Sequence, residues 1–222
     1  MAGVFITFEG IDGSGKSTQM RLLAGALREQ GLAVLTTREP GGTPLGQRLR
    51  AALLDVDELV DPLAELLVFA ADRAQHVRTV LRPAVAAGHV VFSDRYADAT
   101  VAYQGAGRGF EKKLIDEIVT LATDGLKPDL TLIFDLPVAE CVARTRRRHE
   151  SKNTGDRIDS ENIEFHTRVR EGYLRIAAAE PERVRVIEAT GATQETHQKV
   201  SDIVIACLKE RGLISPTLVK GV

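Results

Sequence analysis

Two features common in secreted and membrane proteins, cysteine and long apolar runs, are scarce in this sequence. Its two cysteines, Cys141 and Cys207, are not at metal-ligand spacing, which favours a reduced, cytoplasmic protein over a disulfide scaffold or a zinc site. The longest apolar runs are of strand length, and the N-terminus lacks the basic start and apolar stretch of a secretory signal. We therefore expect no membrane span.

An excess of charge of one sign is missing as well. The 29 lysines and arginines nearly balance 31 aspartates and glutamates, and the formal net charge is −2. Such a chain has no overall field that would attract polymeric nucleic acid or an anionic membrane, so any anion site must be local. Internal repeats, low-complexity tracts and long linkers are also lacking, which predicts one domain over residues 1–212 and a loose tail over residues 213–222.

What the chain does contain is an alternation of short apolar runs with longer segments of helical period. Residues 4–8, 33–36, 89–93, 130–135 and 184–187 are the strand candidates. Their apolar residues are continuous rather than alternating, as expected of parallel strands that are covered on both faces. Together with helical crossovers, they predict an α/β fold with a five-stranded parallel sheet flanked by helices.

The helices have start and stop signals. Thr43-Pro44 and Asp61-Pro62 each place a capping side chain before a proline at the first helical position. The first and last helices are predicted to end near Gly31 and Gly212. The apolar stripes of the first, third and last helices are Met20, Leu23, Ala24 and Leu27; Leu63, Leu66, Leu67, Ala70, Ala74 and Val77; and Val200, Ile203, Val204, Cys207 and Leu208.

Residues 10–17, Gly-Ile-Asp-Gly-Ser-Gly-Lys-Ser, match the nucleotide-binding P-loop between the first strand and the first helix. Glycines let backbone N–H groups turn toward phosphate oxygens, Lys16 reaches the terminal phosphates, and Ser17 is a Mg²⁺ ligand. A glycine-rich turn with an accidental lysine is disfavoured, because four fixed residues occur in the required context. The residues assigned to ATP binding here are Gly10, Ile11, Asp12, Gly13, Ser14, Gly15, Lys16, Ser17 and Thr18.

Two observations argue against a GTPase, because neither an Asn-Lys-x-Asp guanine reader nor a switch-type Asp-x-x-Gly after a strand is present. Instead, Asp94-Arg95-Tyr96 follows the strand at 89–93, which places a carboxylate where open α/β sheets bind their ligands. We expect Asp94 to serve Mg²⁺ directly or through water. The alternative is a capping or ion-paired aspartate.

Two further motifs identify a family. Arg38-Glu39-Pro40-Gly41-Gly42-Thr43 follows the second strand, and Asp94-Arg95-Tyr96 continues to Thr100 and Ala102-Tyr103-Gln104-Gly105. With the P-loop, these motifs resemble the thymidylate kinase family from Phe5 to about Leu208. The resemblance implies a P-loop nucleoside monophosphate kinase fold, ATP-dependent phosphorylation of dTMP to dTDP for dTTP synthesis, Mg²⁺ as cofactor, and a homodimer formed by helix packing.

The resemblance also implies roles at the acceptor site. Arg38 and Arg95 would hold the dTMP phosphate, and Asp12 would approach the sugar 3′-hydroxyl. The Glu39-Pro40 bond would be cis. The residues implied around the base and deoxyribose are Phe69 (stacking), Arg73 (hydrogen bonding), Thr100, Gln104, and Tyr103 against the sugar.

Helical geometry supports one part of this site independently. Phe69 and Arg73 are four residues apart, on a common flank beside the apolar stripe, so they can form one wall against a flat base. Without the resemblance, a peripheral core phenylalanine and a solvated arginine would be favoured. Ala99 stands where the family usually has serine, which removes a hydroxyl near the base.

Six basic residues against two acidic ones, and the turn signal Asn153-Thr154-Gly155, predict a mobile cationic loop over residues 144–157. The family has its lid here. Because Gly13 occupies the P-loop position where some members have arginine, the chain resembles the bacterial type with a lid arginine. We favour Arg148 as the catalytic one, then Arg146 or Arg144, and place the latter two at ATP. The residues implied in catalysis are Lys16, Arg38, Arg95 and Arg148.

Other readings of these motifs remain at this point. A deoxynucleoside kinase would need a carboxylate base near a 5′-hydroxyl, and a regulatory module would bind ATP without turnover. His76 and His149 are interpreted as solvated side chains rather than general bases, because a phosphate acceptor is already anionic.

Overall fold

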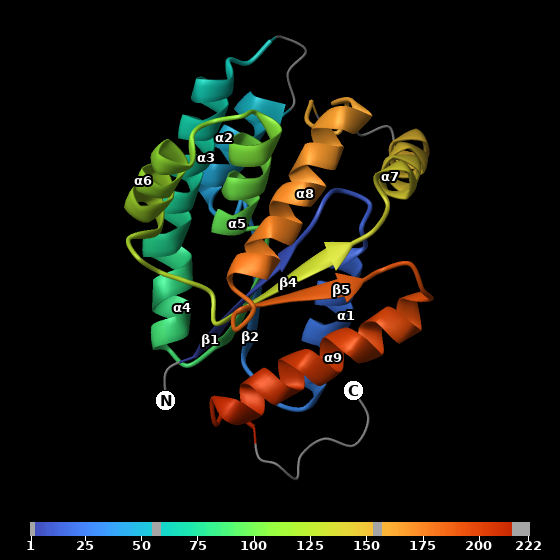
Figure 1. Ribbon diagram of the computed structural model, residues 1–222. Coiled ribbons are helices and arrows are strands. Elements are labelled where there is room, and N and C mark those ends of the chain that lie inside the picture. The colour runs from blue at the N-terminus through green and yellow to red at the C-terminus, as the bar shows by residue number, and fades with distance from the viewer. Residues whose placement is uncertain (1–2, 55–58, 153–156, 215–222) are drawn as a thin grey trace.

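The computed structural model describes residues 3–54, 59–152 and 157–214. Five parallel strands form one sheet in the order β2-β3-β1-β4-β5 (Figure 1). Each lies within two residues of its predicted bounds, so the predicted fold class is confirmed. The strands are β1 (Val4–Glu9), β2 (Val34–Arg38), β3 (Val90–Asp94), β4 (Leu130–Asp135) and β5 (Val184–Glu188).

Helices connect these strands. The α-helices are α1 (Lys16–Glu29), α2 (Pro44–Leu54), α3 (Pro62–His76), α4 (Arg82–Ala86), α5 (Ala97–Thr100), α6 (Lys112–Thr123), α7 (Val138–Lys152), α8 (Ile163–Ala179) and α9 (Thr193–Glu210). Two π-helical segments, η1 (Val77–Leu81) and η2 (Val101–Gly107), continue α3 and α5. No helix among the described residues is long and apolar enough to cross a bilayer.

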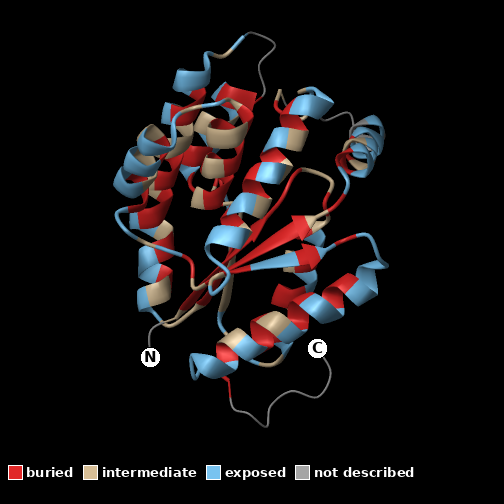
Figure 2. Ribbon diagram, viewed as in Figure 1, coloured by how far each residue is buried: buried red, intermediate tan, exposed pale blue. Residues whose placement is uncertain are grey.

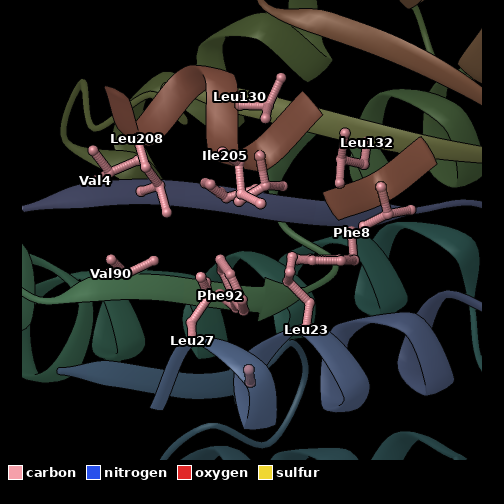
Figure 3. Packing of buried hydrophobic residues seen from close by; sticks show 14 of the residues in the cluster. Val4, Phe8, Leu23, Leu27, Val90, Phe92, Leu130, Leu132, Ile205 and Leu208 are labelled. Carbon is pink, nitrogen blue, oxygen red and sulfur yellow. The ribbon is translucent and has the colours of Figure 1, made fainter. Parts of the chain in front are cut away.

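The sheet is buried between two layers of helices. Helices α1 and α9 lie on one face, and α3, α5 and α8 lie on the other side (Figures 1 and 2). On the first face, Leu23 and Leu27 of α1 and Ile205 and Leu208 of α9 belong to one buried apolar cluster with Phe8 (Figure 3). The continuous apolar strands follow from this coverage of both faces.

The start and stop signals of the helices behave as expected. The Asp61 carboxylate accepts a hydrogen bond from Leu63 N at 2.8 Å, and Thr43 Oγ1 accepts one from Gly46 N at 2.9 Å. Gly31 and Gly212 have φ angles of 84° and 71°, the left-handed conformation that ends a helix at little cost for glycine.

The predicted cationic loop is wrong for residues 144–152, which are helical in α7. Arg144 with Glu140 and Arg146 with Glu150 form i,i+4 ion pairs that favour helix over loop. The turn signal at Asn153-Thr154-Gly155 lies outside the described residues. The start of the predicted loose tail is also ordered, since Leu213 N donates to Leu208 O and Ile214 is buried in the core.

The third helix does not bury the stripe that its sequence suggests. Leu66 is fully buried, but Leu63 and Leu67 are 45% and 51% exposed. Glu65, Asp72, Arg73 and His76 are buried instead. The helix therefore turns its polar flank inward, where these groups find partners, and leaves part of its apolar stripe at the surface.

We predict that Gly172→Ala destabilises the protein by about 1–3 kcal/mol, because a Cβ there would lie 2.8 Å from the Cβ of Ala106 and 3.1 Å from Ala102 Cα. Gly25→Ala in α1 is the matched control, since its Cβ would meet no atom within 4 Å. It should gain up to about 1 kcal/mol from helix propensity. Urea unfolding measures both, and equal stabilities would contradict the close packing of α8 on η2.

Candidate active site

One cavity of about 360 Å³ opens where the carboxyl ends of β1, β2 and β3 meet. These strands are neighbours, and their register pairs Phe8 with Asp94 and Asp94 with Arg38. The volume suits a small-molecule ligand. Its lining includes Asp12, Lys16, Ser17, Arg38, Phe69, Arg73, Asp94, Arg95, Ala99, Thr100, Tyr103, Gln104 and Arg148.

The P-loop forms one end of this cavity. Gly13 and Gly15 have φ angles of 85° and 97°, which side-chain-bearing residues rarely adopt, and α1 begins at Lys16. Lys16 Nζ donates to Asp12 Oδ1 at 2.9 Å and lies 3.9 Å from Asp94 Oδ1. Ser14 Oγ is buried and has no hydrogen-bond partner among the described residues. The loop therefore combines positive charge with donors that suit phosphate oxygens.

The two predicted metal ligands lie together. Ser17 Oγ donates to Asp94 Oδ2 at 2.5 Å. A hydroxyl and a carboxylate are hard oxygen donors, and Mg²⁺ commonly takes few protein ligands beside phosphates and waters. The described residues hold no group of three histidines, cysteines or acids that would form a metal site from protein alone. Ser17 and Asp94 thus fit Mg²⁺ brought with a nucleotide.

Arg95 lines the cavity and has a φ angle of 70°, unusual for a non-glycine residue. Its Nη2 donates to Asp12 Oδ2 at 2.6 Å and to the Tyr103 hydroxyl at 2.9 Å, and its Nη1 donates to the Tyr173 hydroxyl at 3.2 Å. Burial alone would raise the pKa of Asp12, but Arg95 and Lys16 hold that pKa well below its usual range. Asp12 therefore stays ionised and fixes both cations.

A buried acid, Glu9, contacts the tyrosine Tyr173, whose hydroxyl group holds Arg95. Its carboxyl group accepts from Tyr96 N at 2.7 Å and from the Tyr173 hydroxyl at 2.8 Å. Burial and the charge of Asp98 raise the pKa of Glu9 from 4.5 to about 8. The group is thus mainly protonated at neutral pH.

Arg73 reaches the cavity, but its guanidinium is already engaged. Nε donates to Glu39 Oε2, Nη1 to Thr100 Oγ1 and Nη2 to the Tyr96 carbonyl, at 2.7, 2.7 and 2.8 Å. The prediction that His76 is solvated is wrong. It is fully buried, with Nδ1 2.9 Å from Glu39 Oε1, because that buried carboxylate recruits both residues. The side chain of His149 lies outside the described residues.

The lid arginines differ in position. Arg148 lines the cavity and lies 3.7 Å from Asp159, whereas Arg144 and Arg146 pair with acids of their own helix. Neither of these two, nor Gly10, Ile11, Gly13, Ser14, Gly15 and Thr18, is among the residues that line it. Helix α7 reaches the P-loop because Gly13 lacks a Cβ, which would lie 2.3 Å from the Cys141 carbonyl oxygen.

The geometry adds residues that sequence reasoning missed. Glu9, Glu65, Asp72 and Tyr173 are almost fully buried and contact or line the site. A signal existed for Glu65 and Asp72, since each is an acid within a mainly apolar helix. Tyr173 gave none, because it lies 164 residues from Glu9 in the chain. The Glu39-Pro40 bond is cis, which confirms the prediction.

Comparisons with known proteins agree with this geometry. A family model described as thymidylate kinase matches residues 8–200. A thymidylate kinase of Nitratidesulfovibrio vulgaris is 50% identical over 202 residues, which are 89% of this chain and 94% of that protein. One of Geobacter sp. strain M21 is 46% identical over 99% of both chains. The crystal structure of thymidylate kinase from Ehrlichia chaffeensis is similar, with TM-score 0.73, 36% identity, and coverage of 92% and 99%.

We predict that Glu9 makes stability fall as pH rises. Because its pKa is raised from 4.5 to about 8, the folded protein holds a proton that the unfolded chain loses above pH 4.5. The contribution of Glu9 to the free energy of unfolding is complete below pH 4.5. It is lost as pH rises toward about 8, by up to about 1.4 kcal/mol per pH unit.

Urea unfolding of Glu9→Gln tests this effect. Relative to the unsubstituted protein, the variant should gain roughly 2–4 kcal/mol between about pH 5.5 and about pH 8.5. Glu117→Gln, which removes an exposed carboxylate of α6, should show no such gain. A Glu9→Gln difference that is constant across this range would show that Glu9 does not titrate there.

Proposed function

Because the chain belongs to the thymidylate kinase family and phosphorylates dTMP to dTDP with ATP, we propose that the cavity of about 360 Å³ holds both reactants. ATP phosphates lie on the P-loop, and dTMP lies between Arg95 and α3. Continuity of one cavity from Lys16 to Phe69 carries this proposal, because it allows two phosphate groups to meet. Family membership sets aside the nucleoside kinase and the regulatory module.

The acceptor phosphate is held by Arg38 and Arg95. Both line the cavity, from the carboxyl end of β2 and the residue after β3, two strands that pair directly. Arg95 is fixed by Asp12 and two tyrosine hydroxyls, so its orientation is set before the ligand binds. Positive charge held in this way screens the repulsion between the two substrates.

The base and sugar lie at the other end of the cavity. Phe69 offers a ring face and Arg73 an edge of its guanidinium, which Glu39 and Thr100 hold in place. Tyr103 stands beside the deoxyribose, and Gln104 borders the base. These positions follow the family's pattern, and all of these residues line the same cavity.

Ser17 and Asp94 would hold Mg²⁺, which supplies charge neutralisation between the transferring phosphates when bound. In the transfer, an oxygen of the dTMP phosphate attacks the γ-phosphorus of ATP as the bond to the bridging oxygen of ADP breaks. Lys16 and Arg148, which line the cavity, stabilise the charge on the moving group. Following the family's pattern, we place Arg144 and Arg146 of α7 near the ATP donor. No general base is needed, because the attacking phosphate is already anionic near neutral pH.

The surface of α3 supports a homodimer. Leu63 and Leu67 are 45% and 51% exposed on α3, and Leu121 is 77% exposed on the adjacent α6 (Figure 1). We place this face at the dimer interface, since exposed apolar patches often mark such contacts.

The two cysteines form no disulfide, in keeping with a cytoplasmic location.

We predict that Arg148→Met lowers kcat by about 10³-fold or more, since a charge-neutralising arginine contributes on that scale in related chemistry. The KM values for ATP and dTMP should change little. Arg147→Met is the matched control, because Arg147 is exposed on the same helix and donates to the carbonyl of Ala143. Coupled ADP release measures both, and a larger loss in Arg144→Met or Arg146→Met would move the role there.

We predict that Leu67→Glu converts the dimer to monomers by placing two buried charges in its interface. Leu22→Glu, a 39% exposed leucine on α1 across the sheet, should leave the dimer intact. Sedimentation velocity at several concentrations distinguishes the two forms. A dimer that persists in Leu67→Glu would exclude this face.

A further inference from the structure

One buried carboxylate accepts four hydrogen bonds from three residues in two parts of the chain. Glu65 of α3 is 1% exposed. Its Oε1 accepts from Gln104 Nε2 at 2.9 Å and from Arg108 Nε at 3.1 Å. Its Oε2 accepts from Arg108 Nη2 at 2.9 Å and from Arg157 Nη2 at 2.5 Å. These four bonds fill the acceptor capacity of a carboxylate.

Glu65 is therefore charged and has no acceptor position left for a substrate. Burial would raise its pKa, but hydrogen bonds from Arg108, Arg157 and Gln104 outweigh burial and lower it. Arg108 is itself held, because it stacks 4.5 Å over the Phe165 ring and pairs with Glu161 at 2.6 Å. Glu65 can influence the reaction only through the residues that it holds.

The contact with Gln104 decides which end of that amide faces the cavity. Gln104 is 2% exposed and lines the cavity. Its NH₂ group must point at the carboxylate, because the reverse orientation would place two acceptors against each other. The amide oxygen is then the group left for a ligand.

A fixed acceptor distinguishes pyrimidine bases. Thymine carries a hydrogen on N3 and can donate to the Gln104 oxygen, whereas N3 of cytosine has only a lone pair. To accept cytosine, Gln104 would have to rotate its amide by half a turn, which would set its oxygen against Glu65. A buried polar mismatch of this kind is strongly disfavoured.

Arg157 extends the same cluster to the segment that follows α7. Its Nε donates to the Leu53 carbonyl at 3.3 Å, and its backbone N donates to the Leu54 carbonyl at 3.2 Å. The next two residues, Ile158 and Asp159, line the cavity. Through its bonds to Gln104 and Arg157, Glu65 thus connects the residue beside the base to residues 157–159.

We propose that Glu65 is a positioning residue that locks the Gln104 amide with its oxygen toward the base and thereby makes the site select bases with an N3–H over cytosine. This rests on the proposed function, which places the base beside Gln104. Glu65→Gln removes the lock, since a glutamine there can donate its own NH₂ group to a rotated Gln104.

The experiment measures the dissociation constants of dTMP and dCMP by calorimetry, with competition against dTMP for the weaker ligand. In Glu65→Gln, dTMP should weaken by a few-fold and dCMP should tighten, so that their ratio falls about tenfold, the scale of one hydrogen bond. Gln104→Met should lower the ratio similarly, and the double variant should lower it no further. Glu161→Gln, which removes the other partner of Arg108, should leave the ratio unchanged.

The outcomes are distinct. An unchanged ratio in Glu65→Gln, an equal weakening of both ligands, or additive effects with Gln104→Met would overturn the role of Glu65. If the unsubstituted protein itself showed no preference for dTMP over dCMP, the proposed base site would be wrong instead. Should Glu65→Gln fail to fold, Glu65→Asp decides by the same criteria, because it retains the charge for the arginines but withdraws the carboxylate from Gln104.

Discussion

The site depends on carboxylates that hold cations in place around the cavity. Asp12 binds both Lys16 and Arg95, Glu39 binds Arg73, and Glu65 binds Arg108 and its neighbours. Two anionic substrates would repel each other in this small cavity without fixed positive charge. Cations that are already oriented by carboxylate partners reorganise little when the substrates bind, which is the condition for electrostatic catalysis.

The fold brings these charged residues together because several backbone segments approach one another closely. The sheet order places β1 between β3 and β4, so the P-loop opens beside Asp94 and Arg95. Gly13 allows α7 to contact the P-loop, which brings Arg148 to the cavity without an arginine inside the loop itself. Asp72 and Arg73 of α3 line the cavity, while Leu63 and Leu67 of the same helix are exposed at the surface.

Much of the fold and of the candidate site could be predicted wherever the sequence signal is local. The strands, the P-loop and the helix caps followed from short motifs. The family resemblance implied the cis Glu39-Pro40 bond and named residues that line the cavity. The lid prediction failed over 144–152, because a high density of arginines suggests a loop while their i,i+4 ion pairs stabilise a helix. The prediction for His76 failed for a different reason, because its partner Glu39 lies 37 residues away in the chain.

The sequence by itself determined the α/β class, the succession of strand, phosphate-binding loop and helix, and the kinase family. Each of these is encoded by neighbouring residues. Only the tertiary structure decided which charges are buried, which arginine of α7 reaches the cavity, and that Glu65 gathers donors from positions 104, 108 and 157. Burial and the ion pairs of these buried groups depend on contacts between distant segments, and no local pattern in the chain specifies them.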